Sequence, residues 1–192
     1  MGRENSPSRD QLFQTAARLF YRHGYRAIGV DTIAAASGIG KMTLYRHYPS
    51  KDALIAAYLE DNNEVFWQNF TALTQGQTTA RGKLLAFFEG LQSYATTPAC
   101  YGCPFLNVAT EYPAPDYPGH QIALAHKESV RAVFRQLAQE AGARQPDVLA
   151  DGLFLLMDGA YMAARVFGAS PHSPAAQVAT AARQLIEAQC GA

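Results

Sequence analysis

The feature that most constrains the fold of this 192-residue sequence is a helical spacing of apolar residues in the absence of any strand pattern. No segment alternates apolar and polar residues over the length of a strand, and no Asn-Gly or Asp-Gly pair joins two such segments. Leu12, Ala16 and Leu19 instead follow the i, i+4, i+7 spacing that places side chains on one face of a helix. The sequence therefore predicts an all-α fold.

Helix ends can be placed from residues that start or stop helices. Gly24 and Gly38 suit left-handed C-terminal turns, Pro49 disfavours helix at the residue before it, and Ser50 suits an N-cap. The run YPAPDYPGH has too many prolines to be helical. We expect about nine helices, at roughly residues 8–23, 30–38, 41–48, 50–70, 80–96, 103–111, 119–141, 147–167 and 174–189.

Charge is unevenly distributed although the chain has no net charge. Residues 1–55 contain eight Lys/Arg and four Asp/Glu, and the remaining residues contain eight and twelve. This asymmetry is either accidental or the mark of a basic binding module on an acidic body. The opening MGRENSPSRD is polar, and the longest apolar run, from residue 153, is interrupted by Asp158. We therefore expect a cytoplasmic protein without a membrane partner.

Two short helices joined by a glycine-containing turn, the second rich in hydrogen-bond donors, are typical of a helix-turn-helix (HTH). Leu44 and Tyr48 are four residues apart and can pack on the first helix. A short solvated connecting helix is the alternative. The run GIGKMTLYRH also resembles a phosphate-binding loop, but Ala35 stands where that loop needs glycine, and Met42 separates its Gly-Lys from its Thr.

The run FQTAARLFYRHGYRAIGVDTIAAASGIGKMTLYRHYPSKDAL, residues 13–54, resembles the DNA-binding domain of the TetR family of transcriptional repressors. The resemblance implies an HTH domain over residues 1–49 and an effector-binding and dimerisation domain over residues 50–192. It further implies a homodimeric repressor that binds a pseudo-palindromic double-stranded DNA operator and is released by a small-molecule effector. No enzymatic activity, cofactor or metal is implied.

The resemblance also assigns roles to individual side chains of the HTH. Base or groove contacts fall to Lys41, Met42 and Arg46. Phosphate contacts fall to Thr43, Tyr45, His47 and Lys51. Three departures from the family pattern are Gly29, Gly40 and Met42, which replace a frequent capping Ser or Thr, a frequent Ser and a frequent Gly. Thr32 either replaces the lost capping hydroxyl at the phosphates or is only solvated.

The larger half combines many aromatic residues with few charges, which suits an apolar or aromatic effector. The candidate pocket residues are Trp67, Phe88, Phe105, Asn107, Glu111, His126, Met157, Asp158 and Tyr161. Most of the apolar members are equally compatible with an ordinary core. Glu111 either faces the effector or pairs with Lys127 or His126. Asp158, in an apolar helix, either contacts the effector or forms an ion pair with a residue such as Arg165 or His126.

The last two long helices, about residues 147–168 and 174–189, contain small residues that allow close packing and are our candidates for the dimer interface. They could also be internal core of one subunit.

Cys100 and Cys103 form a Cys-x-x-Cys pair, which suggests either two reduced small residues or a redox-responsive repressor. A helical ligand-binding or interaction protein without an operator remains a further alternative. The effector and the operator sequence cannot be identified from the sequence.

Overall fold

The structure, a computed structural model, describes residues 6–170 and 172–191. These residues form nine α-helices and one 3-10 turn, without a strand. The elements are α1 (Pro7–His23), α2 (Val30–Ser37), α3 (Lys41–His47), α4 (Lys51–Thr74), α5 (Ala80–Ala95), α6 (Pro104–Glu111), α7 (Pro118–Glu140), α8 (Pro146–Phe167), η1 (Pro174–Gln177) and α9 (Val178–Cys190). The all-α prediction is confirmed. Residues 1–5 of the expected first domain lie outside the described residues.

The helix ends follow the local signals in the sequence. The Ser50 hydroxyl accepts a hydrogen bond of 3.0 Å from the amide of Ala53 and so caps α4. Gly38 closes α2 with φ of 68°, a left-handed conformation that glycine adopts without a steric penalty. Gly29 precedes α2 without any side-chain cap, as expected from the missing hydroxyl.

Two elements differ from the expected ranges. Helix α4 continues past Phe70 to Thr74, where the Thr74 hydroxyl donates a hydrogen bond to the Phe70 carbonyl within the last turn. The expected helix at 174–189 begins as the one-turn η1 before α9, because Ser173 caps the Ala175 amide and Gln177 departs from helical angles. Neither difference changes the order of the helices.

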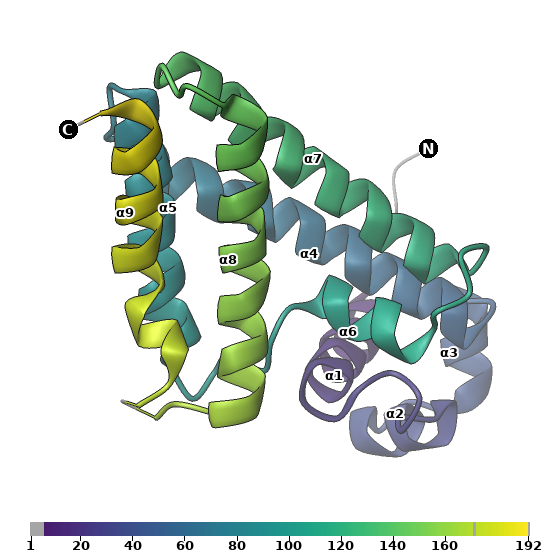
Figure 1. Cartoon of the computed structure of the whole chain (residues 1–192). Coiled ribbons are helices and arrows are strands. Elements are labelled where there is room, and N and C mark those ends of the chain that lie inside the picture. Colours follow the sequence, from purple (N-terminus) through teal and green to yellow (C-terminus); the bar gives the residue numbers. More distant parts are fainter. Residues whose placement is uncertain (1–5, 171, 192) are drawn as a thin grey trace.

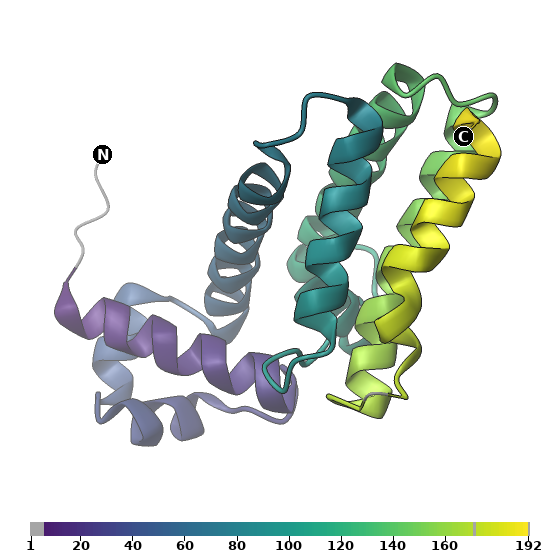
Figure 2. The ribbon, with the colours of Figure 1, turned by 90° about the vertical axis from the view of Figure 1, so that its left-hand side faces the viewer.

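The helices form two regions linked by α4 (Figures 1 and 2). Helices α1, α2 and α3 lie together at one end. Helices α5, α7, α8 and α9 form a bundle at the other end, and α4 runs from the first region along α7 and α5. Helix α6 lies between the two regions, beside α1 (Figure 1). It is therefore placed to contact both.

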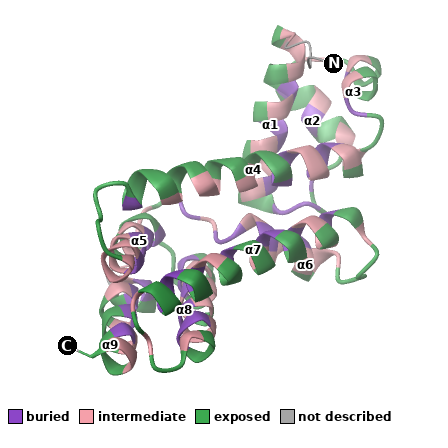
Figure 3. Cartoon of the chain, turned by 90° about the horizontal axis from the view of Figure 1, so that it is seen from above, coloured by how far each residue is buried: buried purple, intermediate pink, exposed green. Residues whose placement is uncertain are grey.

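Buried apolar residues form two clusters (Figure 3). One lies in the bundle of α5, α7, α8 and α9. The other contains the core of α1–α3 together with Leu54, Ile55 and Tyr58 of α4, and Phe105 and Val108 of α6. The core of the α1–α3 region thus continues past residue 50 and includes a helix from the second half of the chain. Among the described residues, no helix is both long and apolar enough to cross a membrane.

Candidate DNA-binding face and effector cavity

Helix α3 has one buried and one exposed side. Leu44 is fully buried against α1 and α2, and Tyr48 is also buried. Met42 is 84% exposed and Tyr45 is 45% exposed, which is unusual for large apolar side chains with nothing to cover them. The exposed side of α3 is therefore available to a partner.

The predicted DNA-contacting residues lie on or next to this side. On α3, the side chains of Lys41, Tyr45 and Arg46 are exposed in addition to Met42, and on α2 the side chain of Thr32 is exposed. Three are half-buried: Thr43, His47 and Lys51. Amide groups at the start of α4, beside Lys51, add a positive helix end to this face.

Lys41 forms an ion pair with Asp31, in the first turn of α2. Both side chains are more than half exposed, so the pair is weak in water. The carboxylate lies next to a predicted base-contacting residue, where it would repel DNA phosphates. A contact of Lys41 with DNA would therefore require Lys41 to exchange Asp31 for the DNA.

A cavity of about 500 Å³ lies between the two regions. Its walls come from α4, α5, α6, α7 and α8, and also from Tyr21 of α1. Most of the wall is apolar or aromatic. A hollow of this size and character is typical of small-molecule sites. Because α1 contributes a residue, a ligand in the cavity would touch the DNA-binding region directly.

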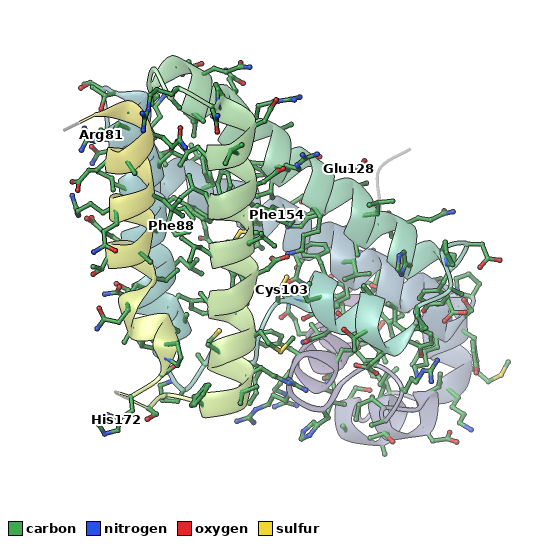
Figure 4. The ribbon with its side chains drawn as sticks, viewed as in Figure 1. Arg81, Phe88, Cys103, Glu128, Phe154 and His172 are labelled. Carbon is green, nitrogen blue, oxygen red and sulfur yellow. The ribbon has the colours of Figure 1, made fainter. Side chains whose placement is uncertain are left out.

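Four of the nine predicted pocket residues line this cavity: Phe105, His126, Met157 and Tyr161. The others lie outside the lining. Trp67 packs edge-on against Phe66 and Phe70. Phe88 is fully buried in the bundle core (Figure 4). Asn107 donates a 3.4 Å hydrogen bond to the Tyr101 carbonyl.

Glu111 connects α6 to the DNA-binding region. Its two carboxylate oxygens accept hydrogen bonds from the amides of Tyr25 (3.0 Å) and Arg26 (2.6 Å). The Glu111 carboxylate does not pair with Lys127 or His126, which were the partners suggested by the sequence. Gly24 has φ of 86°, and a Cβ at this position would lie 2.7 Å from the Glu111 carboxylate. A glycine is thus required beside this contact.

Asp158 pairs with Lys127 of α7, instead of Arg165 or His126. The two side chains are only 18% and 13% exposed. Lys127 lines the cavity, and Asp158 lies behind it. A pair this enclosed is sensitive to the loss of either partner, because the remaining charge would stay buried.

The sequence interpretation missed Tyr21, Phe66, Tyr94 and Lys127, all of which line the cavity. Tyr21 lies within the segment that resembles an HTH domain, so nothing in the sequence connects it with a ligand. Its hydroxyl donates to the Gly102 carbonyl (3.0 Å), accepts from the Tyr101 amide (3.0 Å) and lies 2.8 Å from the Tyr94 hydroxyl. Burial raises the pKa of Tyr21, so its phenol remains protonated.

Cys100 and Cys103 are both free and buried, and Cys103 lines the cavity directly before α6 (Figure 4). Burial raises the pKa of both thiols, so the reactive thiolate is disfavoured. In the described part of the chain, no three His, Cys, Asp or Glu side chains cluster closely enough to hold a metal.

An exposed basic HTH joined to a helical domain with a largely apolar cavity defines the chain as a DNA-binding transcription regulator of the HTH class. Residues 12–58 match the family model described as bacterial regulatory proteins, tetR family. Residues 80–182, more than half of the chain, match the tetracyclin repressor-like C-terminal domain. The chain belongs to the TetR family, whose members regulate transcription and are not enzymes.

Individual relatives agree with this assignment. The chain is similar to the crystal structure of SCO4454, a TetR-family regulator from Streptomyces coelicolor, with 30% identity, a TM-score of 0.85 and coverage of 94% and 93% of the two chains. A TetR regulator from Chloroflexus aurantiacus is 28% identical, with a TM-score of 0.81 and 95% coverage of each chain. The regulator YjdC of Escherichia coli is 26% identical over 154 residues, which is 79% of this chain and 80% of YjdC.

Proposed function

We propose that this TetR-family regulator is a homodimeric repressor that acts in the cytoplasm and leaves its operator when a small apolar or aromatic effector binds the cavity. The single observation that carries the proposal is that α1, a helix of the HTH region, shares the wall of the cavity with α4, α5, α6, α7 and α8 through Tyr21. We assign residues 1–49 to DNA binding and residues 50–192 to effector binding and dimerisation.

Helix α6 offers a physical route between effector and DNA. At its start, Cys103, Pro104 and Phe105 line the cavity, and the Pro104 carbonyl accepts a 2.9 Å hydrogen bond from the Tyr25 hydroxyl. At its end, Glu111 holds the segment between α1 and α2. A ligand that moves α6 would therefore move the HTH. The ligand would shift the population of dimers only if it bound the dimer arrangement that fits the operator and the arrangement that does not with different affinities.

The exposed side of α8 and α9 supports dimerisation. Val148, Leu155, Met162 and Val166 lie on one side of α8 and are 55%, 69%, 45% and 68% exposed. A shallow hollow between α8, η1 and α9 is lined mainly by apolar and small residues. A second copy that covers this face would bury these side chains and hold two HTH units on one pseudo-palindromic operator.

The redox alternative gains no support from the thiols. Burial raises the pKa of Cys100 and Cys103, which is the opposite of what a sensing thiolate requires. The largely apolar cavity instead supports a ligand that binds without covalent chemistry.

Fluorescence anisotropy with labelled DNA from upstream of the chain's own coding region tests operator binding. We expect binding that prefers this DNA to a scrambled duplex and weakens steeply with added salt. Equal affinity for both duplexes would contradict the repressor assignment.

A thermal-shift screen of neutral aromatic compounds, followed by anisotropy with each stabilising compound, tests effector release. A stabilising compound that leaves operator affinity unchanged would contradict it.

A further inference from the structure

The cavity wall carries almost no charge. Lys127 is the one side chain charged at neutral pH among the described residues that line it. A cationic ligand would meet this ammonium group. An anionic ligand would draw Lys127 away from Asp158 and leave a largely buried carboxylate unpaired. The cavity therefore favours a neutral ligand.

The apolar part of the wall is made largely of rings. Phe66, Phe70 and Phe87 pack edge-on or tilted against one another, with centroid separations of 6.0 and 5.4 Å to Phe87. All three line the cavity, together with Phe105 and Tyr94. Edges and faces of rings in such an arrangement are complementary to a flat apolar ring system.

His126 is a polar side chain buried in this wall, with only 4% of its surface exposed. Its ring stacks on Phe105 at a centroid distance of 3.7 Å and an angle of 12°, and meets Phe66 edge-on at 4.9 Å. Nδ1 of the ring lies 2.7 Å from Oδ1 of Asn63. An amide oxygen can only accept a hydrogen bond, so Nδ1 must carry a proton and donate.

The second ring nitrogen is left with a lone pair. Burial, with a smaller contribution from Lys127, lowers the pKa of His126 to about 3, so the ring is neutral at neutral pH and its single proton is the one on Nδ1. No donor in the described part of the chain reaches Nε2. Nε2 keeps contact with space that water or a ligand can enter, so a hydrogen-bond donor on a ligand would take the place of water there.

Some other polar groups of the wall are engaged within the protein, whereas the side chains of Asn69 and Tyr161 form no hydrogen bond with the described residues. The Tyr21 hydroxyl takes part in three hydrogen bonds, with Tyr94, Tyr101 and Gly102. The Asn62 amide donates to the Tyr58 carbonyl at 2.7 Å. Nε2 of His126 is thus an open acceptor of this wall, and the one that belongs to a ring stacked between other aromatic side chains.

We propose that His126 selects the effector by accepting, at Nε2, a hydrogen bond from a neutral ring compound that carries a hydroxyl group. The inference rests on the proposed function, because it concerns the same cavity, and it names the class of ligand. His126 is then a specificity-determining residue, because a compound of the same shape without the donor would leave Nε2 unpaired.

Isothermal titration calorimetry of the full chain with three naphthalene derivatives tests this selection. The probes are 2-naphthol, 2-methoxynaphthalene and 2-naphthoate, which share one ring system but present a donor, no donor and a negative charge. We expect 2-naphthol to bind about tenfold more tightly than 2-methoxynaphthalene, the effect of one hydrogen bond to a buried acceptor. We expect 2-naphthoate to bind more weakly than 2-naphthol.

Three variants separate the hydrogen bond from packing. His126→Phe keeps a ring against Phe105 but has no acceptor, so the preference for 2-naphthol should fall to less than about twofold. His126→Gln offers an amide oxygen and should regain part of the preference. Asn69→Ala removes a different polar group from the cavity wall and should keep the full preference. Thermal unfolding checks that each variant folds. If His126→Phe does not fold, the ratio of the affinities for 2-naphthol and 2-methoxynaphthalene is compared between the wild type and His126→Gln instead.

Equal affinity of the wild type for 2-naphthol and 2-methoxynaphthalene, or a preference that survives His126→Phe, would overturn the inference. Tighter binding of 2-naphthoate would overturn the requirement for a neutral ligand. Absence of binding by all three probes would overturn both the inference and the effector site. Binding of 2-naphthol with the expected preference, but without any change in operator anisotropy, would support the inference and contradict the proposed release of DNA.

Discussion

At the scale of single residues, we propose different tasks for different side chains of the DNA-binding face. Phosphate contacts are independent of sequence, whereas contacts with base edges distinguish one operator from another. Arg46 is exposed on α3, and Lys51 is half-buried at the start of α4, beside the helix N-terminus. The different positions of these two cations support the different roles proposed for them.

Replacement of Lys51 by alanine should weaken binding to all duplexes about equally, because one phosphate contact is lost. The slope of log affinity against log salt concentration should fall in magnitude by about one. Replacement of Arg46 by alanine should cost about 1–3 kcal/mol on the operator and much less on scrambled DNA, because a base contact is lost. Anisotropy titrations with both duplexes at several salt concentrations measure both effects. Parallel losses in the two variants would contradict the division of roles.

At the scale of elements, α6 is a short helix with contacts at both ends. Its first residues line the cavity, and its last residue, Glu111, holds two backbone amides of the DNA-binding region. Its buried face, with Phe105 and Val108, belongs to the same apolar cluster as α1 and α3. These contacts connect the cavity with the DNA-binding region through one eight-residue helix.

Replacement of Glu111 by alanine should release the amides of Tyr25 and Arg26. We expect their hydrogen exchange to accelerate at least about tenfold, because a charge-assisted hydrogen bond is lost at each. Exchange in the core of α8 should not change. Glu128→Ala, which removes an exposed acid of α7, is the control. Unchanged exchange at both amides in Glu111→Ala would show that the contact does not hold the HTH to α6.

At the scale of the whole molecule, the HTH region contributes the exposed face of α3 and the bundle contributes the exposed face of α8 and α9. The HTH region presents its polar face at one end, and the α8–α9 face is exposed at the other (Figure 3). The ion pairs Arg131–Asp151 and Arg135–Asp147 join α7 to α8 beside this face. Two half-sites on DNA require two HTH units at a fixed distance, which a symmetric dimer supplies.

Leu155→Arg should break the proposed dimer, because the twofold symmetry would bring two arginines into an apolar interface. We expect the dimer dissociation constant to rise by at least about 100-fold, as burial of an unpaired charge costs several kcal/mol. Sedimentation velocity measures the shift, and circular dichroism checks the helix content. Leu124→Arg, at an exposed leucine of α7, is the matched control. A Leu155→Arg protein that remains dimeric would place the interface elsewhere.

The sequence by itself determined the helices and the HTH, because both depend on local patterns. The spacing of apolar residues, the caps at Gly38 and Ser50 and the run of donors on α3 each lie within a few residues of one another. The two differences from the expected ranges are the extension of α4 to Thr74 and the 3-10 turn at Pro174–Gln177, each about one turn long and each with a side-chain hydrogen bond.

Only the tertiary structure decided the cavity and the contacts across it. Periodicity identifies the buried face of each helix but not the helix that it meets, so Tyr21 could not be connected with Phe105 and His126. The partners of Glu111 and Asp158 were misjudged for the same reason. A carboxylate pairs with whichever donor the packing of distant helices brings within about 3 Å, and no local pattern encodes that distance.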